Sequence, residues 1–241
     1  MSEATGITSL LTSALETARD TSLVARLHRT DLRQRVAEQL ALVSLQIQAV
    51  SAELDCEGER VDEVANYLDK LNSKRNNGLI IASVILGALT TGAAALVNDN
   101  NLNKGVALSG GLISAGLGAL TINYAGKKIE FLHPRNLLRD IWADSLMGDH
   151  YPPTVWYVLH DKTFSNSGQT TLGHNLKNRW LQFELGGKTG KEKEQLLFGP
   201  GGVYTSEDLH TRSALINQLQ ATIRSIQQDL SSLALSVNGF F

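Results

Sequence analysis

Two long, almost uncharged apolar stretches lie back to back in the middle of the chain and dominate its hydrophobic pattern. The first covers residues 78–97, the second covers residues 105–125, and a polar loop at 98–104 joins them. Each stretch is about as long as a helix must be to cross the ~30 Å hydrocarbon core of a bilayer. We therefore predict a glycine-rich helical hairpin over residues 78–126 that inserts into a membrane.

Small residues recur at four-residue spacing along both stretches, which lets helix backbones approach closely in lipid. The predicted packing ridges consist of Ser83, Gly87, Thr91 and Ala95 in the first stretch and Gly110, Ser114 and Gly118 in the second. The bulkier side chains of the first stretch are expected to face lipid: Leu79, Ile80, Val84, Ile85 and Leu89.

Basic residues flank the hairpin on both sides: Lys74, Arg75, Lys127 and Lys128. By the positive-inside bias, both long arms of the protein then lie on the side of the membrane from which the hairpin was inserted. The second stretch is rich in glycine and serine and makes a marginal independent span. A hairpin packed inside a soluble helical bundle is therefore the alternative.

Heptad spacing of apolar residues marks two further segments, residues 31–77 and residues 206–241, and predicts long helices packed in coiled-coil fashion. The predicted core positions are Val36, Leu40, Val43, Ile47, Val50 and Leu54 in the first, and Ile216, Leu219, Ile223, Ile226, Leu230 and Leu233 in the second. The two helices are natural partners within one chain, and an oligomeric coiled coil would use the same residues. Arg212 occupies one apolar slot, and the first pattern fails at Gly58, where a kink is expected.

The N-terminal residues 1–30 predict an amphipathic helix over about 6–28, which ends at a break near Thr30 and Asp31. Residues 127–205 predict a helix over 129–147 followed by a small mixed α/β subdomain at 151–205. Its expected strands are residues 154–160, 180–185 and 194–198, which are rich in β-type or alternating residues. The fold class is accordingly mainly α.

No pattern of catalytic or ligand-binding residues accompanies these elements. The net charge is −2, which offers no basic field for nucleic acid, and Cys56 is the single cysteine. The six histidines form no helical metal-ligand pair, and the Gly186–Thr189 segment lacks the spacing of a phosphate loop. We expect no enzyme activity and no cofactor or metal, and the N-terminus does not have the pattern of a secretory signal peptide.

The combination of long helices with an apolar hairpin resembles the α-helical pore-forming toxins in outline. This resemblance implies an oligomer that permeabilises a membrane, either the cytoplasmic membrane or the membrane of a target cell, after a soluble stage. The partners we predict are the lipid bilayer, further copies of the chain and a protein bound at residues 151–205. Two other functions fit the same pattern: a non-lytic membrane-anchored coiled-coil scaffold and a soluble structural bundle.

Overall fold

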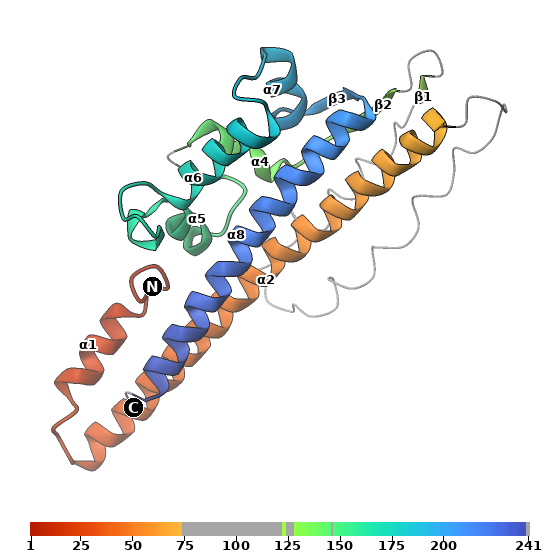
Figure 1. The fold of residues 1–241 in the computed structure, drawn as a ribbon. Helices are drawn as coiled ribbons and strands as arrows, with labels where there is room; N and C mark the ends of the chain where they lie inside the picture. The colour runs from red at the N-terminus through yellow and green to blue at the C-terminus, as the bar shows by residue number, and fades with distance from the viewer. Residues whose placement is uncertain (74–121, 124–127, 146, 240–241) are drawn as a thin grey trace.

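The computed structural model describes residues 1–73, 122–123, 128–145 and 147–239. Two long helices form the frame of the molecule: α2 (Leu23–Ser73) and α8 (Ser206–Asn238). They lie side by side and antiparallel, so that residues near the start of α8 meet residues near the end of α2 (Figure 1). The prediction of a mainly α protein with two long, mutually packed helices is confirmed.

The α2–α8 interface is formed by the predicted heptad positions. Ile47, Leu54 and Ile223 are each at most 1% exposed, and the remaining core positions are buried or half-buried. The heptad spacing therefore placed the side chains of both helices correctly. The structure shows this interface within one chain.

The break between the first two helices lies earlier than predicted. Helix α1 (Thr8–Glu16) ends well before residue 28, and α2 begins at Leu23 and continues without interruption through Thr30 and Asp31. The start of α2 is set by Ser22, whose hydroxyl accepts a hydrogen bond from the Ala25 N–H at 3.2 Å. The predicted helix over residues 6–28 was therefore wrong.

Helix α1 packs beside the end of the long pair that is farthest from the sheet (Figure 1). Ile7, which is fully buried, lies in a small apolar cluster with Val36 and Val237. Gln39 also donates a hydrogen bond to the Thr5 carbonyl at 3.1 Å. The N-terminal segment is thus attached to both long helices.

A small antiparallel sheet lies at the opposite end of the pair. Its strands are β1 (Ile122–Asn123), β2 (Lys128–Leu132) and β3 (Gly201–Tyr204), in the order β1-β2-β3. Ile129 pairs with Tyr204, and Phe131 pairs with Gly202. The helix predicted over residues 129–147 is therefore wrong for its first part, because Ile129, Phe131 and His133 alternate as a buried face of β2 and its continuation.

Four helices connect β2 to β3: α4 (Leu137–Ala143), α5 (Pro153–His160), α6 (Leu172–Arg179) and α7 (Lys191–Phe198). A 3-10 turn, η1 (Lys162–Phe164), follows α5, and a π-helical turn, η2 (Trp180–Glu184), follows α6. Together with β2 and β3 they form what we call the lobe, residues 128–205.

The three strands predicted in the lobe are helical instead. Residues 154–160 belong to α5, 180–185 lie mainly in η2, and 194–198 lie in α7. Pro153 sits at the first turn of α5, where a proline has no helical N–H to lose, and Val155 and Leu159 are fully buried. Tertiary burial has outweighed the β preference of the residues themselves.

In the part of the chain that the structure describes, no helix combines the length and the apolar character needed to cross a bilayer. The predicted hairpin, residues 78–126, lies almost wholly outside the described residues, as do its packing and lipid-facing side chains. Ile122 and Asn123 belong to β1 rather than to a helix. Of the flanking basic residues only Lys128 is described, and it is exposed at the start of β2.

Candidate functional site: a buried polar cluster where the sheet meets the long helices

A cluster of buried polar side chains lies where the sheet meets the two long helices. It occupies the place where the heptad patterns of both helices fail. On α2 the heptad pattern is interrupted at Glu57 and Gly58. On α8 it is interrupted at Arg212, which is 1% exposed. The two interruptions noticed separately in the sequence therefore belong to a single contact.

Gly58 does not kink α2 out of helical conformation, since the helix runs continuously to Ser73. A Cβ at this position would lie 3.3 Å from Asn217 Oδ1 and 3.4 Å from Ile216 Cγ2. Glycine thus allows α8 to approach closely at this point. Glu57, next to it, is then near enough to reach the guanidinium of Arg212.

Arg212 links its own helix, α8, to three other elements. Its Nη1 donates to the Leu197 carbonyl at 2.6 Å, and its Nη2 lies 3.3 Å from Glu57 Oε1. Both Nη atoms lie 3.4 Å from Asn136 Oδ1. Arg212 therefore joins α8 to α2, to the end of α7 and to the start of α4.

Asn136 extends this connection as the N-cap of α4. Its Oδ1 accepts from the Leu138 N–H at 3.2 Å, and its Nδ2 donates to the carbonyls of Leu197 and Gly199 at 3.0 and 2.9 Å. One amide side chain thus caps α4 and also binds the chain as it leaves α7. The cluster fixes the lobe on the helical pair.

Glu57 is the carboxylate that balances the cations of the cluster. Its Oε2 pairs with Arg60, and its Oε1 lies 3.7 Å from His133 Nδ1. Burial by itself raises the pKa of Glu57, but the interactions with His133, Arg212 and Arg60 outweigh that effect and lower the pKa to about 2. Glu57 is therefore ionised throughout the physiological range.

His133 directly follows β2, and its side chain has no exposed surface. Its Nε2 lies 2.6 Å from the Tyr204 hydroxyl, which in turn hydrogen-bonds the Leu196 carbonyl. Because the hydroxyl has one hydrogen and donates it to that carbonyl, Nε2–H must be the donor to Tyr204. This network assigns the unprotonated nitrogen to Nδ1, which faces Glu57 and, within the described residues, has no hydrogen-bond partner.

The surroundings of His133 favour its neutral form. Burial lowers the pKa of His133 most, and the positive charge of Arg212 lowers it further, to about 4 in spite of the opposing effect of Glu57. Burial also raises the pKa of Tyr204, so the hydroxyl stays protonated. The cluster at neutral pH thus combines a carboxylate and two guanidiniums with a neutral imidazole and a neutral phenol.

A second ion-pair group lies further toward the lobe. Glu53 Oε1 is 3.2 Å from Arg135 Nε, and Arg135 also donates to the His150 carbonyl. Asp140, 5% exposed, accepts from the His150 ring at 2.9 Å and from the His150 backbone N–H at 3.1 Å. These bonds join α2 to the loop between α4 and α5, and they extend the same polar contact along the lobe.

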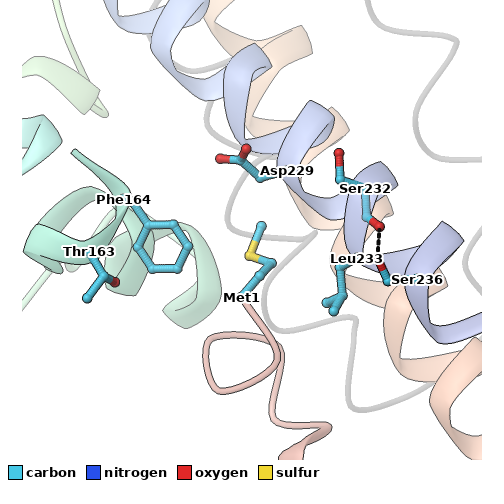
Figure 2. Close-up of a pocket in the computed structure, with 7 residues that line it drawn as sticks. All are labelled: Met1, Thr163, Phe164, Asp229, Ser232, Leu233 and Ser236. Carbon is cyan, nitrogen blue, oxygen red and sulfur yellow. Dashed lines mark hydrogen bonds between the residues drawn. The ribbon is translucent and has the colours of Figure 1, made fainter. Parts of the chain in front are cut away.

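A shallow hollow of about 370 Å³ lies near the N-terminus, between η1 and α8 (Figure 2). The Met1 side chain points between Phe164 of η1 and Leu233 of α8, as Figure 2 shows. The hydroxyls of Ser232 and Ser236 donate to backbone carbonyls one turn earlier in α8, at 3.0 and 2.9 Å. The hollow thus lies between the N-terminus, the lobe and α8. The hydroxyls of its two serines are already used in hydrogen bonds within α8.

Sequence reasoning found the coiled-coil core but missed the polar cluster. Arg212 stands out in the sequence as a charged residue in an apolar heptad slot, and His133 lies within the helix predicted over residues 129–147. Glu57 lies at the interruption of the first heptad pattern, and Tyr204 has no signal in the sequence. The available signal was the coincidence of two heptad failures, together with the alternation of Ile129, Phe131 and His133. Among the described residues there is no group of three side chains placed to hold a metal ion.

Comparison with known protein families, curated proteins and solved structures found no match for this chain.

Proposed function

We propose that the protein is an oligomeric, membrane-inserting α-helical protein that permeabilises a bilayer through its apolar segment, residues 78–121, which ends where β1 begins. The sequence of that segment supports the proposal, since it offers two nearly uncharged stretches of membrane-spanning length joined by a polar loop. The positions of α2 and of the strands, between which the segment lies in the chain, also support the proposal.

The observation that carries the proposal is the place where the chain enters and leaves the apolar segment. Helix α2 ends at Ser73, and the chain is described again from β1 and β2. Figure 1 shows the end of α2 and both strands at the same end of the helical pair. A hairpin that inserts from one side of a membrane must have both of its ends on that side.

The two ends are held by different means. The end of α2 belongs to the long interface, where Ala65 and Leu68 are fully buried. The returning chain is held in the sheet, where β1 pairs with β2 and β2 pairs with β3. The end of α2 and the sheet therefore hold both ends of the segment at one end of the helical pair. This arrangement supports insertion of a hairpin into a bilayer from that end.

The proposal is tested first by placing a fluorophore in the segment. Because Cys56 is the single cysteine and is exposed, Cys56→Ser provides a cysteine-free background. The fluorescence emission of an environment-sensitive dye on Leu89→Cys should shift to the blue when vesicles are added, because insertion moves the dye from water into the apolar bilayer. The control is the same dye on Ser231→Cys, an exposed position of α8, which should not shift.

Dye release from vesicles then tests permeabilisation. The parent chain should release a trapped dye, and Gly87→Leu or Gly118→Leu should reduce the rate at least tenfold because leucine prevents close helix packing. Gly190→Leu is the matched control, since a Cβ there meets nothing within 4 Å. Insertion without release would favour the anchored scaffold, and no insertion at all would favour a structural bundle. Chemical crosslinking of the vesicle-bound protein tests self-association.

A further inference from the structure

We propose that His133 makes the polar cluster an acid-sensitive latch, in which protonation of Nδ1 draws Glu57 away from Arg212 and frees β2 from the helical pair. The latch is a property of the described residues alone. Its link to membrane insertion rests on the function proposed above, because β2 follows the apolar segment in the chain, after β1.

The geometry places the guanidinium of Arg212 and the imidazole of His133 beside the same carboxylate oxygen, for which they compete once His133 is protonated. Arg212 Nη2 lies 3.3 Å from Glu57 Oε1, and His133 Nδ1 lies 3.7 Å from the same atom. A proton added to Nδ1 creates a donor aimed at that oxygen. As Glu57 moves toward the imidazolium, the buried guanidinium of Arg212 loses its carboxylate, and removing one partner of a buried ion pair is strongly destabilising.

The charges that face His133 come from every side of the cluster. Helix α2 contributes Glu57 and Arg60, α8 contributes Arg212, and β3 contributes the neutral Tyr204 hydroxyl. The single carboxylate already serves two guanidiniums. A protonated His133 adds a third cation, on a side chain with no exposed surface, beside the buried guanidinium of Arg212.

His133 is also placed to act on β2. Its ring lies 5.3 Å from the Phe131 ring and 5.6 Å from the Tyr204 ring, measured between centroids. Phe131 in turn lies beneath the Arg60 guanidinium of α2, at 4.7 Å. The buried side chains Ile129, Phe131 and His133 form one face of the strand, so a charge on His133 disturbs the whole contact between β2 and the long helices.

The direction of the pH effect follows from the two states of the imidazole. When β2 separates, His133 regains the ordinary pKa of 6.5, whereas in the closed cluster its pKa is about 4. The open form therefore binds the proton more tightly, and opening becomes more favourable as the pH falls from 6.5 toward 4. Between pH 7 and pH 5 these values correspond to a roughly twentyfold rise in the opening equilibrium constant.

Hydrogen–deuterium exchange of the full chain without membranes measures this opening. After correction for the intrinsic pH dependence of exchange, amides of residues 128–133 should show the roughly twentyfold rise between pH 7 and pH 5, while residues 43–54 should not. In His133→Gln the rise should disappear. His28→Gln, which removes an exposed histidine of α2, should behave as the parent chain. An unchanged rise in His133→Gln overturns the latch.

A second measurement keeps the test open if His133→Gln does not fold. In the parent chain labelled with 15N-histidine, the His133 resonances should report the neutral Nε2–H form at pH 7. A charged imidazolium at pH 5, in a state whose β2 amides remain as protected as at pH 7, overturns the latch.

Dye release from vesicles at the two pH values then separates the latch from the proposed function. Faster release at pH 5 in the parent chain but not in His133→Gln supports both. Acid-dependent opening without release at either pH keeps the latch and overturns permeabilisation. Equal release at both pH values keeps permeabilisation and overturns the control of insertion by the latch.

Discussion

Along the interface of α2 and α8, the half near α1 combines apolar side chains with a few neutral polar ones, such as Gln220 and Gln227, whereas the half near the sheet also buries a charge, that of Arg212. Val43, Ile47 and Ile226 represent the first half. Glu57 and Arg212 represent the second. Apolar heptads attract one another in several registers, because a shift by one heptad still brings apolar residues together.

The polar half does not tolerate such a shift. Arg212 finds its partners in Glu57, Asn136 and the Leu197 carbonyl, and a shift of seven residues would bury the guanidinium without any of them. We infer that the apolar half supplies most of the stability of the pair, while the polar half sets its register and attaches the lobe. The comparison can be broken or sharpened by substitution in each half.

The largest effect is expected at the polar half. Arg212→Ala should lower the free energy of unfolding by about 3–5 kcal/mol, because it removes a buried guanidinium that joins Glu57, Asn136 and the Leu197 carbonyl, and leaves a cavity among them. Urea denaturation measures this change. Arg224→Ala is the matched control on the same helix, since its pair with Asp55 is exposed on both sides and should contribute less than about 1 kcal/mol. Equal effects at the two arginines would contradict the assignment.

The apolar half should respond to truncation by the ordinary cost of a cavity. Ile47→Ala should lower the free energy of unfolding by about 2–4 kcal/mol, because the isoleucine is 1% exposed in the seam between the helices. The control is Leu45→Ala on the same helix, 63% exposed, which should change stability by no more than about 0.5 kcal/mol. Urea denaturation of both variants gives the comparison.

The close contact of β2 and β3 can be strained without touching the polar side chains. Gly201 has a φ of 94°, and a Cβ there would lie 2.2 Å from the Phe131 carbonyl oxygen. Gly201→Ala should therefore lower the thermal midpoint and cost about 2–3 kcal/mol of stability. Gly190→Ala, in open space, should leave the midpoint nearly unchanged. An unchanged thermal midpoint in Gly201→Ala would contradict the close approach of Gly201 to the Phe131 carbonyl.

The smallest effect is expected at the start of α8. Thr205 and Asp208 form a capping box, in which the Thr205 hydroxyl accepts from the Asp208 N–H at 3.2 Å and the Asp208 carboxylate accepts from the Thr205 N–H at 3.2 Å. Thr205→Ala should cost about 1 kcal/mol in urea denaturation, whereas Thr205→Ser should cost less because serine keeps the hydroxyl. Equal losses in the two variants would argue against the cap.

The same comparison explains what could be predicted from the sequence. The apolar half follows a period that one helix carries by itself, so Val43, Ile47 and Ile223 were identified from spacing alone. The polar half depends on partners that are distant in sequence, since Glu57 and Arg212 meet across 155 residues. No local pattern announces such a pair.

The lobe shows a second limit of sequence reasoning. Residues 154–160 have strong β propensity but form α5, because Pro153 starts a helix and Val155, Val158 and Leu159 are all buried by their neighbours. In β2 the error was the reverse. The alternation of Ile129, Phe131 and His133 indicated a strand, but the segment was read as a continuation of the preceding helix.

The pairing of α2 with α8 also decides when the protein can fold. Gln220 of α8 hydrogen-bonds to Ser51 of α2 across 169 residues, so the face of α2 that packs on α8 lacks this partner until the ribosome has made α8. At synthesis rates of roughly 5–20 residues per second, that interval is on the order of ten to thirty seconds. During it, the face of α2 that packs on α8 has not yet met that helix. A chaperone or a membrane surface that binds nascent chains therefore meets this face of α2 before α8 does.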